Sequence, residues 1–303
     1  MMKSQAAMEY LMTYGWAILV IAVVLAALYS LGIFNPNTFA PKASAGSCEV
    51  VRPFGPGTTT DISLEGTCTN MLPKYVATFN GKNSVITVQN TISTSLPLGA
   101  APRTIIAWFK DKSPSIKAHL FAYGCGGGNC GCLKYFTIYI SYSPTRNPNI
   151  NAMMNAYCTN QVVPITINPN QWYFIAYEYN GTNQIGYIGK GGTLTKASGV
   201  DTYNTISTPF YIGCEGYDNS GICDTEFWNG SIANVQIYNK ALSANQISAL
   251  YQEGIGGDPI NPNHLVAWYP LNGNANDYSG NKYNGKAVNV GYSSTWYKTY
   301  SAP

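Results

Sequence analysis

The sequence predicts a mainly β protein, in which an N-terminal long hydrophobic α-helix is followed by a β-sandwich. The composition is the first observation: 24 Tyr and 30 Gly with only 10% charged residues are typical of β-rich extracellular proteins. From residue 73 onward, strand-length segments rich in β-branched and aromatic residues alternate with Gly, Asn and Pro turns. The third observation is an uncharged stretch between Glu9 and Lys42, whose apolar part, Trp16 to Phe34, is long enough to cross a bilayer as a helix.

The N-terminal segment carries one carboxylate, Glu9, at the start of its apolar run. An ordinary secretion signal has a shorter apolar region and a small-residue cleavage site, and only a poor match follows near Ala43 and Ala45. A carboxylate at this position is costly in hydrocarbon unless it lies at the interface or finds a partner. Cleavage before Gln5 would create such a partner, because the new α-amino group of one copy would lie near Glu9 of another.

The stretch KSQAAMEYL, residues 3–11, resembles the class III signal peptide of archaeal type IV pilins. The resemblance implies that residues 1–4 are a leader, that a prepilin peptidase cuts between Ser4 and Gln5, and that Gln5 and Glu9 act in filament assembly. Ser4 is a departure, since the family has Gly or Ala there. The helix over 5–34 would lie in the membrane before an assembly platform adds it to other copies, and a helix apolar on every side is expected to be buried on every side. An uncleaved membrane anchor with an interfacial Glu9 is the alternative.

The segment 35–72 is predicted to be a neck, because Asn35-Pro36 ends the helix and Pro, Gly and Thr follow. All eight cysteines follow the apolar segment, and an even number favours disulfides in an oxidising exterior. Cys214 with Cys223 and Cys48 with Cys68 are the expected local pairs. The complete set of disulfide candidates is Cys48, Cys68, Cys125, Cys130, Cys132, Cys158, Cys214 and Cys223. CGGGNCGC at 125–132 is predicted to be a loop pinned by cystines, since it has neither zinc spacing nor a strand-to-helix context.

Residues 73–303 are predicted to form the sandwich. The expected strands lie at 75–81, 83–88, 103–110, 134–141, 172–181, 184–189, 209–213 and 227–239. One helix is expected after Ser243, because Ser243 and Gln246 form a capping box. Its apolar face would be formed by Ile247, Leu250 and Tyr251, and Gly254 stands where the helix would stop.

Several of these segments resemble the laminin-G-like members of the concanavalin A-like superfamily, which implies a jelly roll. The strongest match is 227–254, and 76–88 and 104–110 match early strands. Residues 265–285 match the family's opening strand and its Asp-x-Ser-Gly turn, but here they follow the closing helix. A truncated second repeat and a circular permutation both explain this order. So short a segment cannot bury a core of its own, and we therefore predict one permuted jelly roll in which 265–303 supply the opening strands.

The chemistry-bearing residues favour a binding protein over an enzyme. Retaining glycosidases of this fold use paired carboxylates, which the superfamily carries as Glu-x-Asp-x-x-Glu, and the chain lacks that motif. We call the sandwich domain, residues 73–303, the head. Glycan hydrolysis by the purified head would revive the enzyme hypothesis. His119 and His264 are expected to be structural, and most tryptophans are expected in the core. Sugar-facing aromatic residues are expected on loops, namely Tyr123, Tyr142, Tyr157 and Tyr217.

Acidic and amide residues near the expected Cys214–Cys223 loop are a candidate Ca²⁺ site, with solvated turn residues as the alternative. These residues are Asp218, Asn219, Asp224 and Glu226. Asn180-Gly-Thr and Asn229-Gly-Ser are glycosylation candidates.

The predicted function is that of a structural subunit of an archaeal type IV pilus-like surface filament with a lectin-like adhesive head. Its expected partners are other copies of the chain, the prepilin peptidase and assembly platform, the membrane before assembly, and glycans. A monomeric membrane-anchored glycan-binding protein is the alternative. Nucleic acid is not an expected partner, because the net charge is +3 and no basic block occurs.

Overall fold

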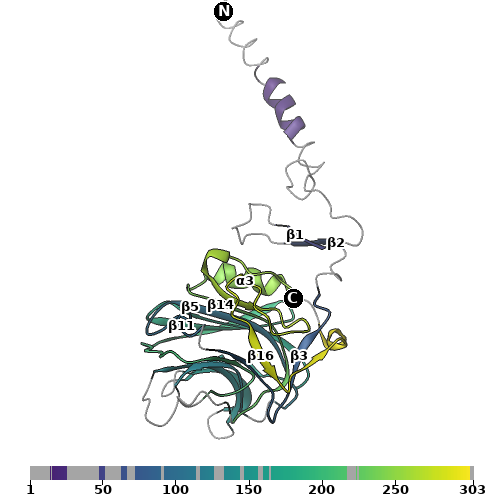
Figure 1. The fold of residues 1–303 in the computed structure, drawn as a ribbon. Helices are drawn as coiled ribbons and strands as arrows, with labels where there is room; N and C mark the ends of the chain where they lie inside the picture. The colour runs from purple at the N-terminus through teal and green to yellow at the C-terminus, as the bar shows by residue number, and fades with distance from the viewer. Residues whose placement is uncertain are drawn as a thin grey trace, which may run out of the picture.

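The fold is a two-layered β-sandwich, as the sequence predicts, and a computed structural model places two antiparallel sheets face to face (Figure 1). The structure describes residues 14, 16–25, 48–51, 63–66, 72–89, 92–113, 117–125, 133–143, 147–155, 160–163, 165–216, 223 and 225–300. Separate from the sandwich sheets, β1 (Cys48–Val51) and β2 (Ser63–Gly66) pair with each other.

The first sheet has eight strands in the order β12-β11-β10-β5-β14-β3-β17, with β15 also paired to β14. Their bounds are β3 (Val76–Asn80), β5 (Arg103–Asp111), β10 (Trp172–Tyr179), β11 (Asn183–Lys190), β12 (Thr193–Val200), β14 (Asn229–Tyr238), β15 (Leu265–Tyr269) and β17 (Gly291–Ser293). β5, β10 and β14 are buried along almost their whole length, because they lie in the middle of the sheet with one face toward each of two apolar clusters.

The second sheet has seven strands in the order β16-β4-β13-β6-β7-β8-β9. Their bounds are β4 (Val85–Val88), β6 (Ala118–Gly124), β7 (Tyr135–Ser143), β8 (Asn147–Asn155), β9 (Asn160–Val163), β13 (Phe210–Ile212) and β16 (Gly285–Val288). Two short 3-10 helices, η3 (Pro262–His264) and η4 (Trp296–Thr299), lie in the C-terminal segment.

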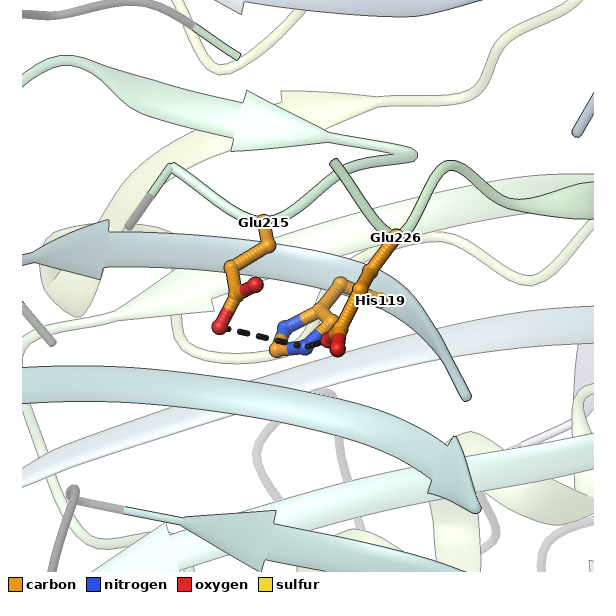
Figure 2. A group of neighbouring side chains, drawn as sticks. All are labelled: His119, Glu215 and Glu226. Atoms are coloured by element: carbon orange, nitrogen blue, oxygen red, sulfur yellow. Dashed lines mark hydrogen bonds and ion pairs between the residues drawn. The ribbon is translucent and has the colours of Figure 1, made fainter. Parts of the chain in front are cut away.

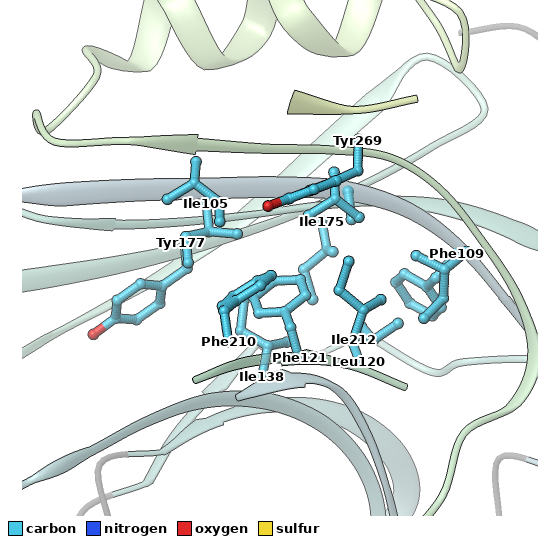
Figure 3. Packing of buried hydrophobic residues seen from close by; sticks show 14 of the residues in the cluster. Ile105, Phe109, Leu120, Phe121, Ile138, Ile175, Tyr177, Phe210, Ile212 and Tyr269 are labelled. Carbon is cyan, nitrogen blue, oxygen red and sulfur yellow. The ribbon is translucent and has the colours of Figure 1, made fainter. Parts of the chain in front are cut away.

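The main core fills the space between the sheets (Figure 3). Ile105 and Ile175 project from the first sheet toward Phe121 and Ile212 of the second, and all four are fully buried. Burying apolar surface in this way is the dominant favourable term in folding.

A second apolar cluster lies on the outer face of the first sheet, where α3 (Ala244–Gln252) covers it (Figure 1). Tyr251 of α3 stacks on Trp108 of β5, with ring centroids 5.8 Å apart. The predicted capping box is confirmed: the Gln246 backbone N–H donates to Ser243 Oγ, and the Ser243 N–H donates to Gln246 Oε1. The tryptophans behave as expected, with Trp108, Trp172, Trp228 and Trp296 all buried.

The C-terminal segment contributes strands to both sheets. β15 pairs with the second half of β14, whose first half pairs with β3, so that β3 and β15 lie along the same side of β14. β16 pairs with β4 in the other sheet, and β17 pairs with β3. This pairing is the arrangement that a permuted sandwich requires, and the permutation itself stays a prediction.

The N-terminal helix is described only at residue 14 and over residues 16–25, which are helical and exposed. Within the part of the chain that the structure describes, no helix combines the length and apolar character needed to cross a membrane. The structure therefore gives no support to a long helix over the whole of 5–34. The leader residues Ser4 and Gln5, together with Glu9 and most of the neck, lie outside the described residues.

Candidate functional site

A cavity of about 300 Å³ opens beside the loop that follows α3. It is lined by Leu72, Pro73, Asn234, Ile255, Gly256, Asp258, Trp268, Pro270, Asn272 and Tyr278. The lining thus combines aromatic and aliphatic surface with a few amide and carboxylate groups. That combination, in a concave site of this size, is typical of small-ligand pockets.

Two aromatic rings, those of Trp268 and Tyr278, are held in place within this pocket. The indole Nε1–H of Trp268 donates to Asn234 Oδ1 at 2.8 Å, and the Tyr278 backbone N–H donates to the Trp268 carbonyl at 2.8 Å. The rings meet edge to face with centroids 6.2 Å apart, and Tyr278 is 54% exposed. The Trp268 ring is fixed by its own hydrogen bond, and the Tyr278 hydroxyl accepts a hydrogen bond from Asn274 Nδ2 at 3.1 Å. Less conformational entropy is therefore lost when a ligand stacks on these rings.

Asn234 supports the pocket from the middle of β14. Its backbone has a φ of 50°, a left-handed conformation that Asn tolerates better than most residues, at the point where the pairing of β14 with β5 shifts register. Its Nδ2 donates to the Gly257 carbonyl at 2.8 Å, and its Oδ1 also accepts a hydrogen bond from Gln236. This buried network connects the strand to the loop after α3.

The Asp277-Tyr278-Ser279-Gly280 turn forms the adjoining wall. The Asp277 carboxylate accepts backbone hydrogen bonds from Trp268, Ser279 and Tyr283 at 2.9 to 3.0 Å. The Asp-x-Ser-Gly motif that the sequence analysis singled out therefore positions Tyr278 against Trp268.

A separate group of side chains, His119, Glu215 and Glu226, forms what we call the His–Glu cluster (Figure 2). His119 Nε2 lies 2.7 Å from Glu226 Oε2 and 3.7 Å from Glu215 Oε1. The Lys117 ammonium lies 2.7 Å from Glu226 Oε2 and 3.9 Å from Glu215 Oε1. One ligand atom from each cluster member lies within 4.8 Å of the others.

The backbone around the cluster is tied together at several points. His119 lies in β6 and its N–H donates to the Glu226 carbonyl at 3.1 Å, while the Glu215 N–H donates to the Thr225 carbonyl at 3.4 Å. The predicted Cys214–Cys223 disulfide is confirmed. It closes the loop whose two ends carry the carboxylates.

Burial and local charge give the cluster members different proton affinities. Burial lowers the pKa of His119 to about 4. Burial also opposes ionisation of Glu226, but hydrogen bonds to His119 and Lys117 outweigh it and lower the pKa of Glu226 to about 2. Burial raises the pKa of Glu215 to about 7, with Lys117 acting against that rise.

The structure separates the residues predicted to bind Ca²⁺. Glu226 is described and contacts His119 and Lys117, whereas Asp218, Asn219 and Asp224 lie outside the described residues. The sequence analysis missed Glu215 and assigned His119 only a structural role. No local signal could have joined His119 to Glu226, because they are 107 positions apart.

The prediction that Tyr123 faces sugar from a loop is wrong. Tyr123 lies in β6 and is fully buried, and its hydroxyl donates to the Pro97 carbonyl while accepting a hydrogen bond from Arg103. The loop placement predicted for Tyr142 is also wrong, because this residue lies within β7 and pairs with Ile150. Its side chain and the whole of Tyr157 and Tyr217 lie outside the described residues.

The remaining cysteine predictions are only partly visible. Cys125 is disulfide-bonded. Cys48 begins β1. Cys68, Cys130, Cys132 and Cys158 lie outside the described residues.

The two glycosylation candidates differ in environment. Asn180 is exposed in the β10–β11 turn, where its Oδ1 accepts hydrogen bonds from the Thr182 and Asn183 backbone. Asn229 is half-buried, and its Nδ2, the atom that would carry a glycan, donates to Ser113 Oγ at 2.9 Å. Glycosylation of both stays a prediction.

Comparisons with known proteins agree with the architecture. A family model described as the concanavalin A-like lectin/glucanases superfamily matches residues 80–248. A putative carbohydrate binding protein from Bacteroides ovatus aligns at 16% identity over 83% of this chain and 70% of its own, with a TM-score of 0.53. This similarity shows a shared fold.

Two further solved structures are more distant. A SAP-like pentraxin from Limulus polyphemus aligns at 16% identity over 72% of this chain and 94% of its own, with a TM-score of 0.48. The Ruminococcus gnavus IT-sialidase CBM40 bound to α2,3 sialyllactose aligns at 15% identity over 59% of this chain and 97% of its own, with a TM-score of 0.45. No curated protein sequence matches the chain.

Proposed function

The chain belongs to the concanavalin A-like lectin/glucanases superfamily, and from that premise we propose that it binds glycans through the pocket beside Trp268 and Tyr278. The single observation that carries the proposal is this pair of immobilised rings in a cavity that also presents exposed Asp258 and Asn272. The apolar face of a sugar ring stacks on aromatic side chains, while its hydroxyls need polar partners. The volume of about 300 Å³ lies at the small end for ligand pockets and suits one sugar unit of a longer glycan.

The test is glycan binding by matched aromatic variants. Tyr278→Ala and Trp268→Ala should each weaken binding to array-selected glycans about tenfold, the equivalent of one lost contact of about 1.4 kcal/mol. Tyr297→Ala is the control, because Tyr297 is 55% exposed, like Tyr278 at 54%, but does not line the pocket. Unchanged affinity of Tyr278→Ala, with the native thermal unfolding preserved, would exclude this pocket as the binding site.

For the N-terminal region, we propose that the head belongs to a pilus-like surface filament that other copies, a prepilin peptidase and an assembly platform help to build. The Ser4-Gln5 junction and Glu9 motivate this proposal, and the described helical residues 16–25 expose large apolar side chains, among them Trp16 at 69% and Ile18 at 64%. Burial of such a surface against neighbouring helices or lipid is favourable. The protein would then lie at the cell surface.

N-terminal sequencing of the mature protein tests the filament proposal. Gln5 is the expected first residue, and Glu9→Ala should abolish filaments without changing glycan binding. A mature chain that keeps Met1, with normal surface display of Glu9→Ala, would instead favour a monomeric membrane-anchored lectin. We also propose that the head is not an enzyme, because the chain lacks the Glu-x-Asp-x-x-Glu motif, and glycan hydrolysis by the purified protein would contradict this.

A further inference from the structure

We propose that the His–Glu cluster is a binding site for a divalent first-row transition metal, with Zn²⁺ as the preferred ion. The ligands are His119 Nε2 and one carboxylate oxygen each from Glu215 and Glu226. An imidazole nitrogen with two carboxylates is a ligand set that suits zinc, manganese or iron rather than Ca²⁺, which takes oxygen ligands.

The orientation of the His119 ring carries the argument. Its Nδ1 lies 2.7 Å from Thr137 Oγ1, which in turn lies 2.8 Å from the Phe121 carbonyl oxygen. The Thr137 hydroxyl has one proton, and when that proton goes to His119 Nδ1, the ring donates Nε2–H to Glu226. When the proton goes to the Phe121 carbonyl, which can only accept, Thr137 Oγ1 accepts a hydrogen bond from His119 Nδ1–H. In this second arrangement, the lone pair of Nε2 in the neutral imidazole points at the Glu226 carboxylate.

A lone pair facing a carboxylate oxygen at 2.7 Å requires a positive particle between the two atoms, either a proton or a metal ion. The His119 side chain is 1% exposed, and the Tyr139 ring stacks on it with centroids 5.0 Å apart, so the imidazole cannot turn its Nε2 toward solvent. Metal-binding histidines commonly donate the other ring N–H to a fixed acceptor, which is the role of Thr137 here.

The spacing of the ligand atoms is close to that of a metal site. Ligands bound to Zn²⁺ at about 2.0 to 2.2 Å lie about 3.4 Å apart in a tetrahedron, and the distances from His119 Nε2 are 2.7 and 3.7 Å. A small outward movement of the Glu226 carboxylate, which is 28% exposed, would equalise them. Three protein ligands leave a fourth position for water or a ligand oxygen.

Lys117 takes the place of the cation in this structure. Its ammonium neutralises both carboxylates, yet the side chain is 39% exposed and also lies 4.9 Å above the Tyr139 ring. A long side chain at the surface can swing into solvent at little cost. We therefore infer that a metal ion and the Lys117 ammonium compete for the same place.

Metal titration of the full-length chain tests the proposal. The chain is purified in detergent, stripped with a chelator, and titrated with Zn²⁺ by calorimetry and with Co²⁺ by visible absorption. One Zn²⁺ per chain is expected, and Zn²⁺ should remove the Co²⁺ bands. Thr137→Val preserves the side-chain shape but removes the hydroxyl that contacts His119. It should lower the affinity for Zn²⁺ about 10- to 100-fold, as the loss of such second-layer contacts to a metal ligand does.

Two variants of the site, each with a matched control, separate ligation from folding. Glu215→Gln should lose saturable binding while keeping its thermal unfolding, and Glu178→Gln, a carboxylate of β10 outside the cluster, should bind normally. Lys117→Met should bind Zn²⁺ more tightly than the native chain, whereas Lys196→Met, at an exposed site in β12, should not change affinity. Absence of saturable binding in the native chain, or weaker binding by Lys117→Met, would overturn the proposal and leave a proton-sharing ion cluster.

Discussion

Single residues show how this sandwich accommodates a buried cation. Arg103 is fully buried at the start of β5. Its guanidinium donates to the carbonyls of Gly99 and Ala101 and to the hydroxyls of Tyr123 and Thr205, all neutral acceptors. It also lies 5.5 Å from the ring centroids of Phe136 and Tyr179. Hydrogen bonds to neutral acceptors and contacts with aromatic faces therefore compensate the buried charge of Arg103.

Replacing this cation should destabilise the head. Arg103→Met is expected to lower the free energy of unfolding by about 2 to 4 kcal/mol, because buried carbonyls would lose donors at about 1 to 3 kcal/mol each. The free energy of unfolding of Arg103→Lys should lie between those of Arg103→Met and the native protein, since one ammonium cannot reproduce the several hydrogen bonds of the guanidinium group. Chemical denaturation of the three proteins measures the difference, and an Arg103→Met protein as stable as the native one would show that the charge is dispensable.

A second buried charge, Asp111, should make stability depend on pH. Burial raises its pKa to about 6, against the hydrogen bond from the Ser113 N–H. The native state therefore binds a proton more tightly than the unfolded chain, and stability falls as pH rises from about 4 to about 6. A shift of this size corresponds to about 2 to 3 kcal/mol.

Asp111→Asn removes this charge and keeps an acceptor for Ser113. We expect the variant to be as stable as the native protein at pH 4, and its free energy of unfolding to exceed that of the native protein by about 2 kcal/mol at pH 7. Thermal unfolding across this pH range tests the expectation, with the exposed Asp258→Asn as control. An Asp111→Asn protein that is less stable at pH 7 would mean that the carboxylate makes a favourable interaction in its charged form.

At the scale of elements, features formed by residues close in sequence were predicted correctly. Strands whose residue pattern depends on their place in the sheet were missed. The capping box of α3 and the Cys214–Cys223 disulfide involve residues close in sequence, and both are confirmed. β6 and β12 were missed. β6 is buried at every position and shows no alternation, whereas the exposed, polar β12 lacks an apolar face because it is the last strand of its sheet. Both patterns depend on a strand's position within the sheet, which the segment itself does not encode.

The α3 cap gives a prediction at this scale. Ser243→Ala should cost about 1 kcal/mol of stability, because the Gln246 N–H would lose its side-chain acceptor. The cost should exceed that of Asn245→Ala, an exposed helical position where alanine has the better helix propensity. Equal effects of the two substitutions on denaturant unfolding would show that the cap contributes nothing to the stability of the head.

At the scale of the whole molecule, both candidate sites join parts of the chain that are distant in sequence. The pocket combines Leu72, Asn234, Asp258 and Trp268, and the His–Glu cluster combines β6 with the ends of a loop almost a hundred residues later. The sequence could predict the sandwich and the Asp-x-Ser-Gly turn, because these follow local patterns. It could not predict the sites, since those depend on which strands become neighbours in the sheets.

Residues 265–300 follow the closing helix, although they resemble the opening strands of the family. This order leads to a prediction about the whole fold. β17 pairs Ser293 with Val76, and the indole of Trp296 donates to the Pro73 carbonyl at 2.9 Å, so the end of the described chain lies beside the start of the sandwich. Chain ends that lie close together tolerate permutation. A head in which residue 300 is joined to residue 72 by a short linker, with new termini opened in the exposed Pro262–Asn263 region, should restore the order of the laminin-G-like family.

We expect this permutant to unfold cooperatively, within about 1 kcal/mol of the head in its natural order, because its strand pairing and core would be unchanged and only loop closure would differ. Deletion of residues 262–300 should instead abolish cooperative unfolding. β4 and β3 would lose their partners β16 and β17, and the core would lose Ala267 and Tyr269. Far-UV circular dichroism during denaturation distinguishes the outcomes. A deletion variant that still unfolds cooperatively would identify the segment as a truncated second repeat.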